Sequence, residues 1–367
     1  MRSQKPISIK IPENVDAKWR SKYAENAEYT YTIPRVRRLN RVFVSHEGII
    51  LKKGRLVNRC AFNIRGKRDT NFRYTFWRKT FEQLLVCRYG KSLPSEKLNS
   101  GDYTIVHTKW FNYAFWLNSS IPRLINLADN GMLETTTLLL PEGISNIPFV
   151  VDTLSQFNVK TKIIPAGKHL FIKNFILSET REWSTEFSGA EIFQLRAFLI
   201  PIAQKEAKNF QPPSDKLYLS RKKRGIRGIA NEQELEELLC ANGFKTIYFE
   251  DYSIWEQIIL MNQAKQFISI HGAGCSNVMF MEKDTLFIEL INAPYAELEY
   301  KFPFWKIASL SEVKYSPVFC QTENENASKK ISFGKSNDDS ETDYLVNQNI
   351  VVDLTKVKKI LGSRIEH

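Results

Sequence analysis

The chain has 367 residues, 43% hydrophobic and 25% charged, a composition typical of a globular protein with sizeable cores. Its five cysteines are scattered and form no CxxC pair, which argues against a disulfide framework and against a zinc site. No run is long and apolar enough to span a bilayer, and the N-terminus lacks an apolar signal core. We therefore expect a cytoplasmic protein, peripheral to the inner face of a membrane.

The net charge of +12 is concentrated near the N-terminus. Residues 1–80 carry a balance of +14, whereas the rest of the chain carries −2. A basic face of this kind attracts anionic lipid headgroups, diphosphates or nucleic acid, although a solvated surface is the common alternative. If the segment binds membranes, charge reversal at Arg35, Arg37 and Arg38 is expected to abolish binding to anionic liposomes; unchanged binding would exclude that role.

The first half of the chain alternates strand-like and helix-like segments with some irregularity. The apolar helix over 190–207 could connect two domains. The predicted strands are 102–107, 135–140 and 171–177, and the predicted helices are 112–127, 149–157 and 190–207.

The second half shows a regular βα alternation. A helix is expected to begin at Asn231, where Glu234 gives a capping-box pattern, and to end at Asn242-Gly243. This order predicts a parallel sheet with right-handed crossovers. The predicted strands are 216–220, 244–249, a strand at Phe267 and 285–291; the helices are 254–264, a short one through Met281 and 353–361, after a polar looped segment near 328–342.

The turn after Phe267 carries the sequence His271-Gly272-Ala273-Gly274. Glycines at a strand–helix junction let a ligand approach the backbone, and the amides of the new helix attract phosphate. The histidine adds a donor that can change its charge. Alternatively, the glycines only allow close strand–helix packing, with His271 as a hydrogen-bonded core residue.

A basic loop follows the strand 216–220. Arg221, Arg224 and Arg227 then fall at the carboxyl edge of the predicted sheet, where guanidinium groups could hold a pyrophosphate. A solvated surface turn is the alternative.

An acidic residue, Glu289, closes the strand 285–291 and suits the hydroxyl groups of a ribose. Glu250 and Asp251, at the end of the preceding strand, are weaker candidates. Acids at strand ends are also common turn or cap residues.

The ordered motifs resemble glycosyltransferase family 61. They comprise Ser220-Arg221 with its basic loop, Asn231-Glu232, the His271 turn and Phe287-Ile288-Glu289; upstream, the segment 112–124 is similar to the family's Asn-Tyr-x-His-Trp…Pro-Arg-Leu. The match covers roughly residues 105–310. The resemblance implies an α/β protein of the GT-B arrangement, two Rossmann-like domains facing a cleft, and inversion at the sugar. It implies no metal, because the family does not depend on an Asp-x-Asp metal motif and none stands out in this sequence. It implies no cofactor either, because the nucleotide-sugar, which we expect to be UDP-linked, is a substrate.

The resemblance also assigns residues to substrates. Donor binding falls to Arg221, Arg224, Glu289 and the His271 turn. Acceptor binding falls to the upstream segment, where Phe115 replaces the family's histidine, which indicates a different substrate, a shifted role or an impaired enzyme. The acceptor candidates are Asn112, Tyr113, Trp116 and Arg123, with Trp110 as a further stacking surface; aromatic residues at helical spacing are also common in cores.

Inverting transfer needs a base that takes the acceptor's proton. Asp102, His107 and Glu142 are the candidates in the N-terminal half, and His107 is preferred because it ends a predicted strand. A role as a helix or turn cap would explain His107 almost as well.

These expectations define three regions: an acceptor-side domain over 1–205, a nucleotide-sugar domain over 206–315, and a tail over 316–367 that packs back on the first domain. We expect a transferase that moves a hexose or pentose to a glycan or lipid-linked acceptor in capsular or other surface polysaccharide synthesis. The alternatives are a homologue that binds donor or acceptor without turnover, and a basic nucleic-acid-binding protein. The second ranks lower because no nucleic-acid-binding signature is found.

Overall fold

The computed structural model describes residues 3–53, 55–57, 59–60, 95–108, 111–181, 184–297, 301–323, 345 and 347–362. The predicted looped segment 328–342, Trp110 and the basic residues between 65 and 79 lie outside this part of the chain. The chain divides into two compact units, which we describe separately. Unit 1 comprises Met1–Lys5 and Tyr31–Glu186, and unit 2 comprises Pro6–Thr30 and Phe187–His367. The division falls within two short paired strands, β1 (Gln4–Ser8) and β2 (Glu28–Thr32).

Unit 1 is built on one mixed sheet. The order is β5-β4-β3-β10-β7-β8-β9, with β6 also paired to β10. The pairs from β10 to β9 are parallel, whereas β3, β4 and β5 pair antiparallel. The strands are β3 (Val36–Ser45), β4 (Ile50–Lys52), β5 (Arg55–Leu56), β6 (Ser95–Leu98), β7 (Asp102–Thr104), β8 (Thr136–Pro141), β9 (Lys160–Ile164) and β10 (His169–Ser178).

The predicted helix over 112–127 of unit 1 is present but is not a uniform α-helix. It runs as α3 (Tyr113–Phe115), a π-helical turn η1 (Trp116–Ser120) and α4 (Ile121–Asp129); α5 (Pro148–Leu154) follows β8. In a π-turn the wider spacing loosens the backbone ladder. Here the Asn118 carbonyl accepts a hydrogen bond from the buried Arg181 at 2.6 Å.

Unit 2 contains a six-stranded sheet in the order β12-β11-β13-β14-β15-β16. The first five strands are parallel, and β16 joins β15 antiparallel. Numbered in chain order, the parallel strands follow the doubly wound order 2-1-3-4-5. The strands are β11 (Lys216–Leu219), β12 (Lys245–Ile247), β13 (Gln266–Ile270), β14 (Leu286–Asn292), β15 (Lys314–Thr322) and β16 (Ile350–Val351).

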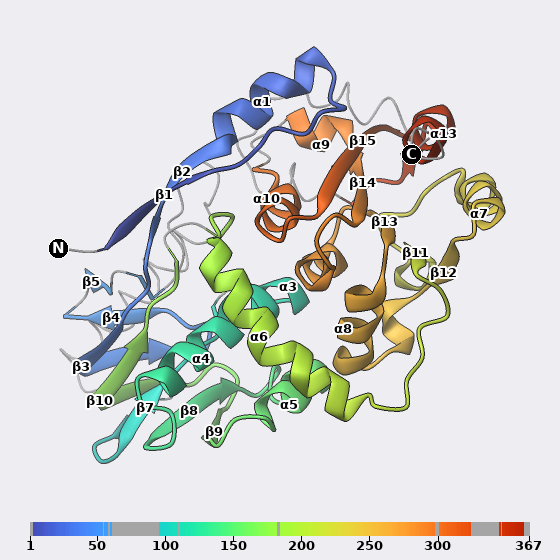
Figure 1. Ribbon diagram of the computed structural model, residues 1–367. Helices are drawn as coiled ribbons and strands as arrows, with labels where there is room; N and C mark the ends of the chain where they lie inside the picture. Colours follow the sequence, from blue (N-terminus) through green and yellow to red (C-terminus); the bar gives the residue numbers. More distant parts are fainter. Residues whose placement is uncertain are drawn as a thin grey trace. The chain divides into compact units, whose positions relative to one another are not determined.

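Helices cover both faces of this sheet, as the predicted βα alternation requires. In Figure 1, α7 and α13 lie on one side of the unit 2 strands, and α8 and α10 lie on the other. The period of two sends Ile288 and Leu290 of β14 into the core under α7 and α13, and sends Phe287 and Glu289 to the opposite face. The helices are α6 (Gly189–Glu206), α7 (Glu232–Ala241), α8 (Ile254–Gln263), α9 (Ala293–Glu297), α10 (Pro303–Leu310) and α13 (Leu354–Gly362), with 3₁₀ turns η2 (Lys222–Arg224), η3 (Phe249–Asp251) and η4 (Ala273–Phe280).

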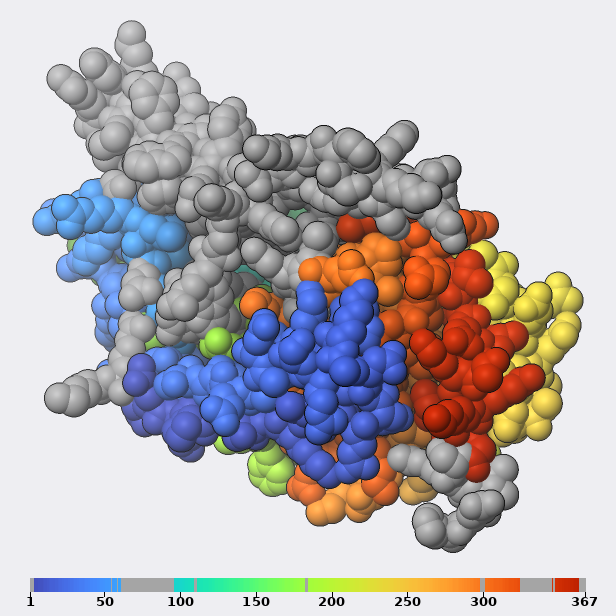
Figure 2. Space-filling view, turned by 90° about the horizontal axis from the view of Figure 1, so that it is seen from above, coloured from blue at the N-terminus to red at the C-terminus, as the bar shows by residue number. Residues whose placement is uncertain are grey.

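Residues Pro6–Thr30 cluster with unit 2, whereas the chain from Tyr31 to Glu186 clusters with unit 1. The aromatic residues of α1 (Ala17–Ala27) explain this: Trp19 stacks on Phe319 with ring centroids 3.9 Å apart, and Tyr23 stacks on Phe302 at 4.1 Å. Figure 2 shows this blue segment beside orange and red residues of the C-terminal part. The tail also clusters with unit 2, because β16 pairs with β15 and α13 packs on the same core.

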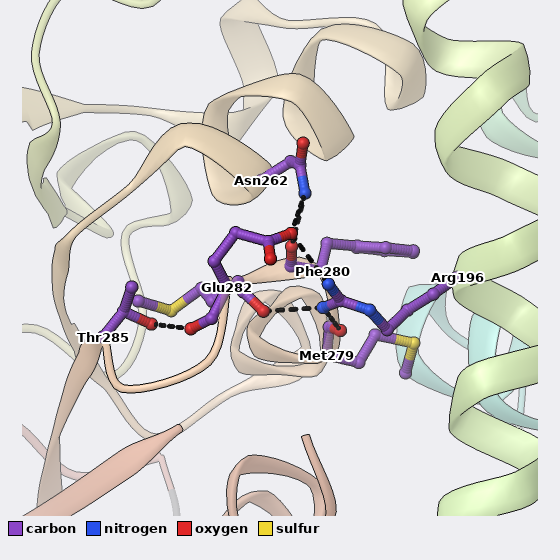
Figure 3. Close-up of polar contacts among 7 residues, drawn as sticks. Arg196, Asn262, Met279, Phe280, Glu282 and Thr285 are labelled. Carbon is purple, nitrogen blue, oxygen red and sulfur yellow. Dashed lines mark hydrogen bonds and ion pairs between the residues drawn. The ribbon is translucent and has the colours of Figure 1, made fainter. Parts of the chain in front are cut away.

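Helix α6 is tied to the end of η4 by a set of partly exposed polar contacts (Figure 3). Arg196 donates to the carbonyl oxygens of Met279 and Met281, each at 2.6 Å, and to Glu282 at 2.9 Å. Asn262 of α8 donates to the same carboxylate at 2.8 Å. A cation at the last carbonyls of a helix is favoured by the helix dipole, so Arg196 fixes where η4 ends.

One local prediction is wrong. Asn231 precedes α7 as expected, but its side chain makes no cap bond with the helix. It exchanges hydrogen bonds with the backbone of Val352 instead, at 2.9 and 3.0 Å. A tertiary partner has therefore replaced the predicted capping box. The real capping box is at α8, where Ser253 and Glu256 bond reciprocally.

Candidate functional site

The carboxyl ends of β11 and β13 lie side by side in unit 2. These two strands are paired in parallel, with Leu219 opposite Ser269. The next strand in the sequence, β12, lies on the other side of β11, so the strand order reverses between β11 and β13. Ligands of open α/β sheets bind in the crevice at such a switch point. The two loops that begin here are the predicted ones, Arg221 onward and His271 onward.

A buried carboxylate shapes the start of the first loop. Glu232, in the first turn of α7, accepts hydrogen bonds from Ser220 at 2.6 Å and from Tyr218 at 2.8 Å. Burial, with the charge of Glu232 adding to it, raises the pKa of the Tyr218 hydroxyl far above its ordinary value, so the hydroxyl stays a donor. The chain therefore leaves β11 in a fixed direction, with Arg221 as the next residue.

Most of the basic side chains in this loop are paired with acids. Lys222 pairs with Glu236, Lys223 with Asp251 and Arg224 with Glu250. Arg224, predicted to bind donor, is thus held by the acid that was a second candidate for the ribose. The exposed positions of these pairs make each worth at most about 1 kcal/mol.

Arg221 differs from these neighbours. Its guanidinium lies against the backbone of Gly272, where a Cβ would come within 2.1 Å of Nη1. Its Nε is buried and has no hydrogen-bond partner among the described residues. Burial, and then the positive charges of Arg227 and Arg224, lower the pKa of Arg221. Arg227 approaches the same turn and donates to the His271 carbonyl oxygen at 3.1 Å. Two guanidinium groups this close favour an anion between or beside them.

The two glycines of the turn have different structural roles. A Cβ at Gly274 would lie 2.8 Å from Leu219 and 3.1 Å from Phe249, so this glycine permits close packing between η4 and the sheet. That is the packing alternative considered from the sequence. Gly272 instead leaves room for the Arg221 side chain, between the two loops. Ala273 begins η4, and amides in the first turn of a helix lack acceptors within the helix.

His271 is held by Glu289. The imidazole Nδ1 lies 2.6 Å from one oxygen of Glu289, and the hydroxyl of Tyr315 donates to the other oxygen at 2.6 Å. The prediction that Glu289 closes its strand is wrong: it lies in the middle of β14 and its side chain is 0% exposed. A parallel strand on each side buries this position, which strand-end arguments from the sequence cannot foresee.

The candidate residues of unit 1 include a buried arginine. Arg123 is 2% exposed and donates to the carbonyl oxygens of Ile105, Val106 and Ser178 at 2.7–2.9 Å. Burial lowers its pKa to about 10. Its guanidinium thus joins the chain after β7 to the end of β10.

His107 is also buried in unit 1. Its Nε2 lies 3.2 Å from the His46 carbonyl oxygen, and its ring contacts the position of Gly48. Burial first, and then the charge of Arg123, lower its pKa to about 3. Such an imidazole is a weak proton acceptor.

The remaining unit 1 candidates have local partners. Asp102 accepts from Arg38 at 2.7 Å, and Glu142 accepts from the Ala166 amide at 3.3 Å. Asn112 caps α3 by accepting from the amide of Phe115. Tyr113 is half-buried and packs edge-on against Phe149, whereas Trp116 is fully buried and donates to Thr153 at 2.8 Å. Their roles toward an acceptor stay predictions.

The basic N-terminal segment is partly neutralised where it is described. Arg37 of β3 pairs at 2.8 Å with Glu179, whose side chain is buried. Charge reversal at Arg37 would therefore disturb the fold as well as any membrane contact.

Sequence reasoning missed Glu232 and Tyr315. Glu232 was noted only as part of a motif, although an acid directly after a cap position is a recognisable signal. Tyr315 lies on β15, which contains Pro317, and a proline inside an apolar run argues against a strand. The proline is tolerated because only the end of β15, at Gln321 and Thr322, pairs with β16.

Residues 113–288 match the model of the family described as Glycosyltransferase 61. The match includes the basic loop, the His271 turn and the segment that begins at Tyr113. It supports a glycosyltransferase, and such enzymes take a donor and an acceptor substrate. The predicted enzyme class is thereby confirmed, and so is the α/β fold class, which rests on the mixed sheets described above. No curated protein matches the chain.

Two further observations concern the described residues only. No group of three or more His, Cys, Asp or Glu side chains among them is placed to hold a metal ion. Within the same residues, no helix combines the length and the apolar character needed to cross a membrane.

Proposed function

We propose that this protein is an inverting glycosyltransferase whose nucleotide-sugar donor, UDP-linked, binds at the switch point between β11 and β13. The observation that carries the proposal is the position of Arg221: a partly buried guanidinium against Gly272, beside the first turn of η4. A diphosphate there would accept hydrogen bonds from Arg221 and from helix amides, and the positive charge would stabilise the departing nucleoside diphosphate.

Unit 1 would supply the acceptor side and the base in a GT-B arrangement. His107 was the preferred candidate for the base, but the greater exposure of Asp102 supports Asp102 in this role. The Asp102 side chain is 22% exposed, whereas His107 is 1% exposed with a pKa of about 3. The glycan or lipid-linked acceptor and the role in surface polysaccharide synthesis are carried over from the family resemblance, whereas the location at the inner face of a membrane rests on the basic charge of residues 1–80.

The test is binding and turnover with a panel of nucleoside diphosphates and their sugars. Wild-type protein is expected to gain thermal stability with UDP and UDP-sugars and to release UDP in the presence of acceptor. Arg221→Ala is expected to weaken UDP binding about 10- to 100-fold, the effect of one or two charge-assisted hydrogen bonds. Lys222→Ala, which removes the adjacent charge already paired with Glu236, is the matched control and should bind UDP like the wild type.

Absence of nucleotide binding would refute the proposal. UDP binding without turnover against a broad acceptor panel would instead favour a homologue that binds donor without catalysis. This second candidate function is retained because Phe115 stands at the position of the family's histidine.

A further inference from the structure

The His271–Glu289 pair is the first part of a longer buried chain of hydrogen bonds. Glu289 accepts from His271 and Tyr315, and the Tyr315 oxygen lies 3.3 Å from the hydroxyl of Tyr23. The four residues come from the turn between β13 and η4, from β14, from β15 and from α1. All belong to unit 2, although Tyr23 precedes Glu289 by more than 260 residues.

Hydrogen-bond chemistry gives this chain a direction. A carboxylate only accepts hydrogen bonds, so the single hydroxyl hydrogen of Tyr315 goes to Glu289. Tyr23 must then be the donor to the Tyr315 oxygen. By the same logic His271 Nδ1 carries the hydrogen in its bond to Glu289. The hydrogen on Nδ1 is therefore committed to Glu289.

The surroundings hold each member in place. The His271 ring packs against Phe304 and Tyr295, with ring centroids 5.0 and 5.6 Å away. Tyr23 is 0% exposed and contacts Phe302 and the edge of Trp305. A phenylalanine would fill that apolar site without the cost of burying a hydroxyl.

The Tyr23 hydroxyl also keeps its hydrogen. Burial, to which the charge of Glu289 adds, raises the pKa of Tyr23 well above its ordinary value. A buried carboxylate such as Glu289 is costly unless both oxygens are bonded. Removing either tyrosine hydroxyl would therefore alter how Glu289 holds the imidazole.

We infer that Tyr315 and Tyr23 are positioning residues that act through Glu289 to fix His271 in its Nδ1–H tautomer. Helix α1 thereby sets the state of the donor-side turn from outside the matched family region. Such outer partners fix the tautomer and orientation of a working histidine. Any effect of these residues on UDP binding rests on the proposed donor site, whereas the tautomer of His271 can be tested without it.

The direct test is nitrogen-15 NMR of the full chain labelled at histidine, with His271→Gln assigning the signal among five histidines. Wild-type His271 is expected to show a hydrogen on Nδ1, the nitrogen that lies 2.6 Å from Glu289. Tyr315→Phe should shift the His271 signals, and Tyr23→Phe should shift them less because it is one bond further away. Tyr29→Phe is the matched control. It removes a tyrosine hydroxyl from the N-terminal part of the chain, one that donates to the Phe187 carbonyl oxygen, and it should leave the His271 signals unchanged.

UDP titration of the same variants separates this inference from the proposed function. Tyr315→Phe is expected to weaken UDP binding about three- to tenfold, in the range of one neutral hydrogen bond, while Tyr29→Phe matches the wild type. An Nε2–H tautomer in wild type, or His271 signals that Tyr315→Phe does not move, would overturn the inference. The expected tautomer without any UDP binding would uphold the positioning network and refute the donor site instead.

Discussion

Each unit contains a histidine and an arginine that the sequence assigned to substrate, yet the two pairs are held in opposite ways. In unit 1, Arg123 donates to three backbone carbonyls and lies beside a buried His107. In unit 2, Arg221 lies against the bare backbone of Gly272, and His271 is bonded to Glu289. The first pair therefore has partners within the fold, whereas the second pair lies in the turn that we propose as the donor site. Residue type and motif did not separate them; their hydrogen-bond partners do.

The largest expected effect comes from the unit 1 arginine. Arg123→Met should lower the free energy of unfolding by on the order of 3 kcal/mol, because it leaves several buried carbonyl oxygens unsatisfied. Arg221→Met should change stability by less than about 1 kcal/mol, because it removes a partly buried cation beside two others. Denaturant titrations of both variants check this. Equal losses in the two variants would break the comparison.

The unit 1 histidine predicts a pH dependence. The pKa of His107 is lowered from 6.5 to about 3, so the unfolded chain takes up this proton first as the pH falls. Its contribution to stability is complete above pH 6.5 and is lost on acidification, by about 1.4 kcal/mol per pH unit below pH 6.

The measurement is the free energy of unfolding from pH 7 to pH 4 for wild type and His107→Gln. The variant is expected to show a shallower slope, since the difference between the two curves isolates this one group. Parallel curves would show that His107 is not kept neutral by burial.

The smallest expected effects distinguish the two glycines of the His271 turn, Gly272 and Gly274. Gly274→Ala should lower stability by about 1–3 kcal/mol through contact with Leu219 and Phe249. Gly272→Ala should displace only the flexible end of Arg221, leave stability nearly unchanged and weaken UDP binding about tenfold. Gly143→Ala, at a position with nothing within 4 Å, serves as the control for both measurements. If Gly272→Ala bound UDP like the control, Arg221 would not be the anchor.

Much of unit 2 could be predicted from its sequence because its signals are local. The period of β13 and β14, the stop at Asn242-Gly243 and the basic loop after β11 all depend on neighbouring residues, and each is observed. The mixed sheet of unit 1 was less predictable, since β3 and β10 pair across more than 120 residues.

The parts that were not predictable depend on distant partners. The Asn231 side chain makes no cap bond with α7 because it is hydrogen-bonded to the backbone of Val352. Tyr23 meets Tyr315 only after the chain returns to pair β15 with β14. The partners of Arg123 come from the chain after β7 and from the end of β10, so its structural role could not be read from the segment that contains it.

The central claim is that the switch point between β11 and β13 holds the donor diphosphate. A crystal structure of the protein with UDP tests it most directly. We expect the diphosphate within hydrogen-bond distance of the Arg221 guanidinium and of the first amides of η4. UDP bound elsewhere, with Arg221 still lying against an empty Gly272 turn, would contradict the claim.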